Sequence, residues 1–234
     1  MDRPGLIKFI HKSFFIVLIF FLPSLLLGQT RAGTELSSLV IARVKYKGGG
    51  DWYNDPSAIP NLGEFIVMNT GVDISNEEAR VSLTEETLFS YPILFMTGHG
   101  RIVLIQEELK RLRTYLLKGG FLYADDDYGM DFYFRSVMRK VFPDRTFKEL
   151  PFSHEIYRCF YKFENGLPKI HEHDNKPPQG FGIFDDYERL MVFYTYETNI
   201  SDGWADPKVH KDPPEKREAA LKMGTNIIIY ALLH

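Results

Sequence analysis

The chain has 234 residues, of which 44% are hydrophobic and 25% are charged, proportions that fit one globular domain with short appendages. Its net charge of −3 disfavours nucleic acids and anionic membrane surfaces as partners. Cys159 is the single cysteine, so an internal disulfide is excluded.

The first 28 residues have the layout of a secretory signal peptide. Basic residues precede an apolar run over 14–27, and Gly28 offers a small residue for cleavage. The run is shorter than the ~20 residues of a membrane-spanning helix, which disfavours an uncleaved anchor. The sequence therefore predicts export, a short linker over 29–38 and no transmembrane segment in the mature chain. An exported chain without disulfides fits the bacterial periplasm or the extracellular space.

The first part of the domain alternates strands with helices. A largely apolar run over 39–46 predicts a strand. The Asp-Pro pair at 55–56 predicts a helix start, with aspartate as the N-cap and proline at the first helical position. Gly71 is expected to end that helix. A short edge strand over 72–74 and a brief helix from Thr84 complete this part.

The central part is typical of a βαβ unit. Residues 92–97 form an apolar run that predicts a buried strand. Apolar residues at helical spacing over 105–116 predict a helix, which the glycine pair 119–120 ends. A second strand is predicted over 121–124, parallel to the first, and a further helix over 132–142. Ligands of such sheets bind beyond the carboxyl ends of the strands.

The C-terminal part is richer in strands. The pattern predicts a strand over 156–163, a polar loop over 166–180, a hairpin of 181–184 with 189–197, and a closing helix over 215–233. Together the elements predict a single α/β domain from residue 39 to the C-terminus. Its expected architecture is a three-layer sandwich with a mostly parallel central sheet, a β-hairpin excursion and a C-terminal helix.

Short motifs are spread over nearly all of the predicted mature chain: Gly49-Gly50-Asp51-Trp52-Tyr53, Tyr91-Pro92, Gly98-His99-Gly100, Leu112-Arg113-Tyr115-Leu116, Gly119-Gly120-Phe121-Leu122, Asp125-Asp126, Phe142-Pro143, His154 and Gly224-Asn226-Tyr230-Ala231. In combination they resemble a bacterial family, the domain of unknown function 4159. The resemblance implies a flavodoxin-like fold of the class I glutamine-amidotransferase type. It also implies an envelope or membrane protein as a partner, because the family recurs as the terminal domain of larger envelope proteins. No activity follows from it.

Three adjacent carboxylates follow the second strand of the central unit. Asp125, Asp126 and Asp127 repel one another unless a cation or hydrogen-bond donors compensate their charge. Mg²⁺ or Ca²⁺ at Asp125 and Asp126 is one interpretation, because hard cations take carboxylate oxygens. The alternative is structural: one aspartate caps the next helix and another accepts a hydrogen bond from a neighbouring loop.

The candidate ligand-binding residues are expected at the carboxyl ends of the strands: Gly98, His99, Gly100, Asp125, Asp126, Asp127, Asp51, Trp52 and His154. His99 is either a ligand or a structural histidine, and its flanking glycines permit close approach of the backbone. Trp52 and Tyr53 follow a glycine-rich turn and are expected to pack over the sheet edge. His171 and His173 alternate like metal ligands, but their Pro-rich context predicts a solvated loop.

Two classes of function remain open. Cys159 lacks the glycine-flanked elbow of amidotransferases and is interpreted as a small buried residue within a strand. The chain also has no Gly-x-Ser-x-Gly motif. These observations favour a non-catalytic binding or interaction domain with a ligand cleft at the strand ends. The alternative is a hydrolase that uses Asp126 and His99, with or without a divalent cation.

Overall fold

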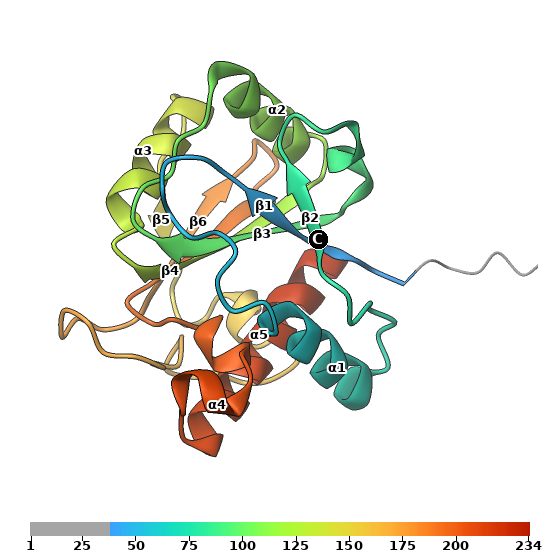
Figure 1. The fold of residues 1–234 in the computed structure, drawn as a ribbon, viewed down its shortest axis with the longest axis vertical. Helices are drawn as coiled ribbons and strands as arrows, with labels where there is room; N and C mark the ends of the chain where they lie inside the picture. Colours follow the sequence, from blue (N-terminus) through green and yellow to red (C-terminus); the bar gives the residue numbers. More distant parts are fainter. Residues whose placement is uncertain (1–37) are drawn as a thin grey trace, which may run out of the picture. The chain divides into compact units, whose positions relative to one another are not determined.

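The computed structural model describes residues 38–234, so the predicted signal peptide and nearly all of the predicted linker lie outside the described residues. Seven strands form one sheet in the order β2-β1-β3-β4-β7-β6-β5 (Figure 1). Their bounds are β1 Ile41–Lys45, β2 Ala79–Ser82, β3 Ile93–His99, β4 Phe121–Tyr128, β5 Lys148–Glu149, β6 Gln179–Phe184 and β7 Leu190–Tyr196. The first five strands in this order are parallel, and β6 and β5 are antiparallel to their neighbours.

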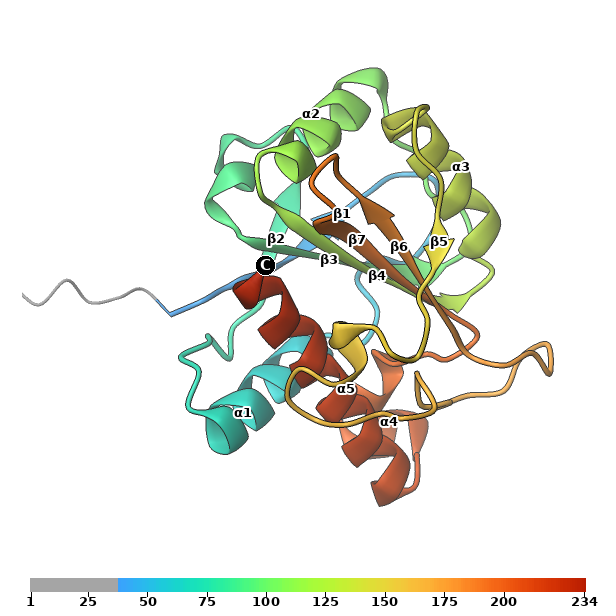
Figure 2. The ribbon, with the colours of Figure 1, turned by 180° about the vertical axis from the view of Figure 1, so that it is seen from behind.

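Helices cover both faces of the sheet. They are α1 Ala58–Thr70, α2 Gln106–Leu117, α3 Asp131–Val141, α4 Pro207–His210 and α5 Pro214–Leu233, with 3₁₀ turns η1 Glu86–Ser90, η2 Glu155–Tyr157 and η3 Asp202–Trp204. Helices α2 and α3 lie on one face, and α1, α4 and α5 lie on the other (Figures 1 and 2). This arrangement confirms the predicted three-layer α/β sandwich with a mostly parallel sheet. Within residues 38–234, none of the helices combines the length and the apolar character that crossing a bilayer requires.

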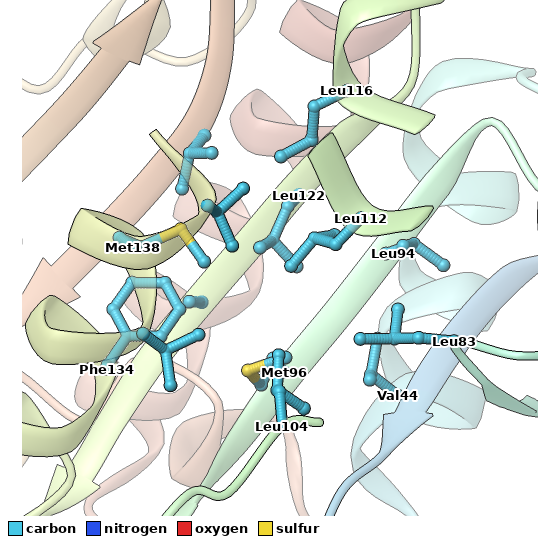
Figure 3. Packing of buried hydrophobic residues seen from close by; sticks show 14 of the residues in the cluster. Val44, Leu83, Leu94, Met96, Leu104, Leu112, Leu116, Leu122, Phe134 and Met138 are labelled. Atoms are coloured by element: carbon cyan, nitrogen blue, oxygen red, sulfur yellow. The ribbon is translucent and has the colours of Figure 1, made fainter. Parts of the chain in front are cut away.

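The two faces of the sheet carry separate cores because side chains alternate along each strand. Leu94 and Leu122 pack under Leu112 of α2 and Phe134 of α3 on one face (Figure 3). On the other face, α1 and α5 cover an aromatic row of Phe95, Tyr123 and Phe193. The ring centroids of the first two are 5.6 Å apart, and those of the last two are 5.9 Å apart. The position of a residue along its strand therefore determines which of the two cores its side chain enters.

Three predicted boundaries in the first half of the domain are wrong. Helix α1 begins at Ala58, because Asp55 has a φ of 43° that no right-handed helix accommodates. The edge strand is β2, whereas residues 72–74 contribute a single isolated bridge to Leu39. Strand β4 extends to Tyr128, so the three aspartates lie within a strand and not in a turn after it.

The C-terminal half agrees with the prediction at its hairpin, β6 and β7, and at its closing helix. The strand predicted over 156–163 is wrong, since the chain there forms η2 and irregular structure. The side chain of Asn226 explains the difference. Its amide nitrogen donates to the carbonyl of Tyr161 at 2.8 Å, and its oxygen accepts from the N–H of the same residue at 2.7 Å. This residue's backbone is thus satisfied by α5 and not by a sheet neighbour.

Candidate functional site

The parallel strands β1, β3, β4 and β7 end at one edge of the sheet, here called the carboxyl edge. The three aspartates of β4 lie close to this edge and alternate between its faces. Asp125 and Asp127 point toward the α1/α5 side, where their side-chain partners Ser201 and Asn54 lie, and Asp126 points toward α3. The geometry therefore gives each carboxylate its own surroundings and does not assemble the expected cation site from Asp125 and Asp126.

Asp125 is fully buried and its oxygens are occupied by protein donors. Thr195 Oγ1 donates to Oδ1, and the backbone N–H and Oγ of Ser201 donate to Oδ2 at 2.6 and 2.7 Å. Burial raises the pKa of Asp125 to about 6, although these hydrogen bonds oppose the rise. Asp125 thereby anchors the segment that follows β7 onto the sheet.

Asp126 stabilises the start of α3. Its Oδ1 accepts from the backbone N–H of Met130 at 2.8 Å, at the residue preceding the first turn of the helix. Burial raises the pKa of Asp126 to about 7, and the charges of Asp125, Asp131 and Glu197 raise it further. Asp125 and Asp126 together match the structural alternative: Asp125 binds a neighbouring loop, and Asp126 accepts from one N–H directly before a helix.

Asp127 is the one aspartate of β4 with a fully buried side-chain oxygen that lacks a hydrogen-bond partner within residues 38–234. Its Oδ2 accepts from Asn54, and its backbone carbonyl accepts from Asn199 Nδ2 at 2.6 Å. Its Oδ1 is buried without a hydrogen-bond partner in the described part of the chain. Burial and the neighbouring Asp202 hold the pKa of Asp127 well above its usual range. The pKa of Asp202 is lowered to about 2, because hydrogen bonds from His171 and Asn199 outweigh its burial.

Two histidines converge on Asp202. His171 Nδ1 lies 2.8 Å from Asp202 Oδ2, and its Nε2 lies 3.0 Å from Asp212 Oδ1. His210 Nε2 lies 4.0 Å from Asp202 Oδ1 and 2.9 Å from Asp55 Oδ2. One ligand atom from each of His171, Asp202 and His210 falls within 4.8 Å of the other two. The hydrogen bond to Asp202 raises the pKa of His171 above its ordinary value despite burial.

Residues 171–173 form a loop, as predicted, but its two histidines are not solvated as expected. His171 is held by two carboxylates, and His173 bonds Asn199 Oδ1 at 2.8 Å while its ring stacks on Tyr128 at 4.5 Å. Sequence reasoning also missed Asp202 and His210. A usable signal was present, because acids and a histidine follow β7 directly and a parallel strand delivers the next segment to the carboxyl edge.

The glycine-flanked loop after β3 presents an exposed acid–histidine pair. The backbone N–H of His99 donates to Asp51 Oδ1 at 2.6 Å, and His99 Nδ1 lies 3.1 Å from Asp51 Oδ2. Gly98 has a φ of 135°, and a Cβ there would lie 2.4 Å from the hydroxyl of Tyr46. Of the expected site residues, Gly98, His99 and Asp51 are thus brought together at the carboxyl edge.

Trp52 and Tyr53, which follow Asp51, differ in their packing. Trp52 is half-buried against the core beneath α2 and α3, as expected, whereas Tyr53 is 59% exposed. The glycine-rich turn before them bonds to the loop after β3, where the N–H of Gly50 donates to the carbonyl of Arg101 at 3.1 Å. This contact explains how Asp51 reaches His99.

His154 lies at the opposite edge of the sheet, so its predicted place at the rim is wrong. Its ring packs 6.3 Å from Phe184 and 5.5 Å from Tyr230, and its Nδ1 accepts from the N–H of Ile156. Phe184 pairs with Leu190, the first residue of β7, which marks the amino edge of the parallel strands. Burial lowers the pKa of His154, and its role is to cap η2.

Cys159 is a half-buried thiol in irregular structure, not in a strand. Its Sγ donates to the carbonyl of Asn226 at 3.3 Å, and burial raises its pKa to about 11. A protonated thiol is a weak nucleophile. The observation agrees with the interpretation that Cys159 is a structural residue.

A cavity of about 320 Å³ opens between α3 and the segment that follows β3. Its polar lining comes from Arg101, Tyr133, Ser136 and Lys140. A neighbouring hollow of about 400 Å³, between α2 and α3, shares Lys140 and Leu109 with it. We call the two together the α2–α3 groove. Sequence analysis did not predict it, because its lining residues come from three separate segments.

Comparison with known proteins identifies the family of the protein but gives no activity for it. No curated protein matches the chain. A family model described as "Domain of unknown function (DUF4159)" matches residues 40–232, which span all of the strands and reach the last turn of α5. Because the match covers most of the chain, the protein belongs to the DUF4159 family.

Proposed function

We propose that the protein is an exported, non-catalytic binding domain of the bacterial envelope that recognises an acidic ligand in the α2–α3 groove. The observation that carries the proposal is the polar lining of the cavity between α3 and the segment that follows β3. Arg101 and Lys140 supply positive charge, and Tyr133 and Ser136 supply hydroxyl groups. A concave site with a few convergent polar groups is the usual form of a small-molecule site.

Charge balance favours an anion as the ligand. Arg101, Lys110 and Lys140 line the groove and form no ion pair within residues 38–234, whereas Arg113 pairs with Asp144 at 3.0 Å. Three uncompensated cations raise the local concentration of an anion and its rate of association. The surrounding hydroxyl groups fit the oxygens of a carboxylate or a phosphate.

The chemistry of the other candidate residues also supports binding over catalysis. Asp125 and Asp126 are engaged in holding the segment after β7 and the start of α3. The thiol of Cys159 is protonated at neutral pH and bonds to α5. These groups serve the fold, so Asp126, one of the two catalytic candidates, has a structural contact.

Binding is tested by thermal unfolding of the mature protein with a panel of carboxylates, phosphates and acidic sugars at low salt. We expect at least one acidic compound to raise the midpoint, because a ligand of the native state alone stabilises it. The double substitution Arg101→Glu with Lys140→Glu should abolish the shift. Lys208→Glu, the same charge reversal on exposed α4, should retain it. A shift that survives the double substitution would contradict the proposed site.

Export is tested separately by mass spectrometry of the protein from its native host. The mature N-terminus is expected near Gln29, directly after the predicted cleavage position. Full-length protein recovered from the cytosol would contradict export and would leave the binding proposal to stand on the groove alone.

The contact between Asp51 and His99 favours a second candidate function, a hydrolase in which His99 activates water or substrate. A carboxylate that bonds one ring nitrogen fixes the tautomer and leaves the other nitrogen as a base. A broad screen with hydrolase substrates, with and without Mg²⁺, distinguishes the two functions. Turnover by the wild type that is lost in His99→Ala and in Asp126→Asn would favour the enzyme, and absence of turnover with retained ligand binding would favour the binding domain.

A further inference from the structure

We propose that His171, Asp202 and His210 form a site for a divalent transition-metal ion of the zinc class. The site lies at the carboxyl edge on the α1/α5 side of the sheet, so it is separate from the α2–α3 groove. Its three residues come from the loop before β6, from η3 and from the end of α4. The inference does not depend on the proposed ligand.

The distances between the donor atoms suit a metal after small movements. His171 Nδ1 and Asp202 Oδ2 are 2.8 Å apart, and His210 Nε2 is 4.0 Å from Asp202 Oδ1. Zinc bonds of about 2.0–2.1 Å place tetrahedral ligands roughly 3.3–3.5 Å apart. The first pair must therefore open slightly, and His210 must approach. His210 ends a four-residue helix, where such a movement disturbs little packing.

Carboxylates around the histidines provide the outer contacts that metal-binding imidazoles usually have. Asp212 Oδ1 lies 3.0 Å from Nε2 of His171, the nitrogen opposite the proposed donor. A carboxylate in this position fixes the tautomer and directs Nδ1 to the metal. Asp55 Oδ2 lies 2.9 Å from Nε2 of His210 and is near enough to supply a fourth ligand, the alternative being water.

An independent observation points to a missing positive charge. Asp127 Oδ1 is fully buried without a partner in the described chain, and its carboxyl lies against Asp202. Together with Asp55 and Asp212, four carboxyl groups surround two imidazoles. An unsatisfied buried polar atom is costly. A dication bound at Asp202 would offset the mutual repulsion of these carboxyl groups.

The donor types decide the class of metal. Mg²⁺ and Ca²⁺ prefer sets made of oxygen, whereas two imidazoles and one carboxylate favour Zn²⁺ and its neighbours in the first transition row. The competing account of the same contacts is a metal-free network in which each histidine pairs with two carboxyl groups. The two accounts differ in whether the histidines bind an added metal.

The experiment titrates Zn²⁺ into chelator-treated mature protein by calorimetry and records the visible spectrum after addition of Co²⁺. We expect one ion per chain, a raised unfolding midpoint and the visible absorption of four- or five-coordinate Co²⁺. His171→Ala and His210→Ala should each weaken binding at least ~10-fold, and Asp212→Asn about 10–100-fold. His234→Ala, which removes a partly exposed histidine just after α5, should bind as the wild type does.

Circular dichroism of each variant establishes that it is folded before titration, and His210→Gln replaces His210→Ala if the alanine variant is not. Absence of stoichiometric Zn²⁺ binding by the wild type would overturn the proposal and leave the metal-free network. Equal affinity in wild type and in both histidine variants would overturn it as well. A midpoint raised by Mg²⁺ but not by Zn²⁺ would also refute it and would favour an oxygen-only site.

Discussion

The wild type is expected to lose stability as the pH rises from about 4 to about 7. The substitution Asp126→Asn is expected to remove a large part of this pH-dependent loss. Burial raises the pKa of Asp126 from 3.8 to about 7 in the folded protein. A carboxyl whose folded pKa is raised stabilises the protein fully below its unfolded pKa, and this contribution disappears as the pH passes the folded pKa.

The expected size follows from the separation of the two pKa values. Each pH unit corresponds to about 1.4 kcal/mol, so about three units give an upper value of roughly 4 kcal/mol. Residual solvent contact at the carboxyl edge lowers this, and we expect about 2–4 kcal/mol. The asparagine keeps an oxygen that accepts from the N–H of Met130 but carries no charge. The variant should therefore exceed the wild type in stability at pH 8.

The measurement is urea unfolding at intervals from pH 4 to pH 8. Asp125 contributes in the same window, because burial raises its pKa to about 6, so the variant retains some pH dependence. Asp73→Asn, at an exposed position, is the control and should follow the wild type. Parallel curves for Asp126→Asn and the wild type would show that Asp126 does not titrate in this range.

Trp204→Ala is expected to lower the free energy of unfolding by about 3–5 kcal/mol. The indole is 1% exposed and lies 5.7 Å from the rings of both Phe95 and Tyr123. Its Nε1 donates to the carbonyl of Ala220 in α5 at 2.9 Å. The truncated side chain leaves a cavity between the sheet and α5, and these elements relax only partly to fill it.

Two companion variants separate the causes of this loss. Trp204→Phe keeps most of the packing and loses the hydrogen bond, so it should cost about 1 kcal/mol beyond any repacking. Tyr187→Ala, at a 92% exposed tyrosine, should leave stability unchanged. A cost below ~1 kcal/mol for Trp204→Ala would mean that η3 is not anchored through its indole. Zn²⁺ affinity measured on the same variant reports how firmly η3 positions Asp202.

Much of the fold was predictable because its central elements are long and strongly patterned. The leucines of α2 and the apolar runs of β3 and β4 specify a βαβ unit without further information. Strand β2 was missed because it has four residues and little apolar character. It is held by pairing with β1 and by the buried ion pair between Arg43 and Glu78, at 2.7 Å. Because these two residues are 35 positions apart, their contact produces no recognisable pattern in the local sequence.

The candidate site was harder to predict from the sequence, because it also depends on contacts between residues that are far apart along the chain. The run of three aspartates has the composition of a turn, yet it continues a strand because remote donors satisfy it. Thr195 and Ser201 bond Asp125 from about 70 positions further along the chain. The carboxyl edge was located correctly from strand order, as Gly98 and His99 show. The identity of its buried partners depended on tertiary pairing that no motif contains.

The position of β7 has a consequence for how the protein folds. Its residue Phe193 pairs with Tyr123, 70 positions earlier. The entropy cost of closing this long loop comes before the strand pairing stabilises the chain. Pairing over such a span is slow relative to local structure. In a chain in which β7 has not yet docked, β4 lacks its β7 neighbour, and its unpaired N–H and C=O groups can pair with another chain. Refolding at high protein concentration is therefore expected to lose material to aggregation through these unpaired groups.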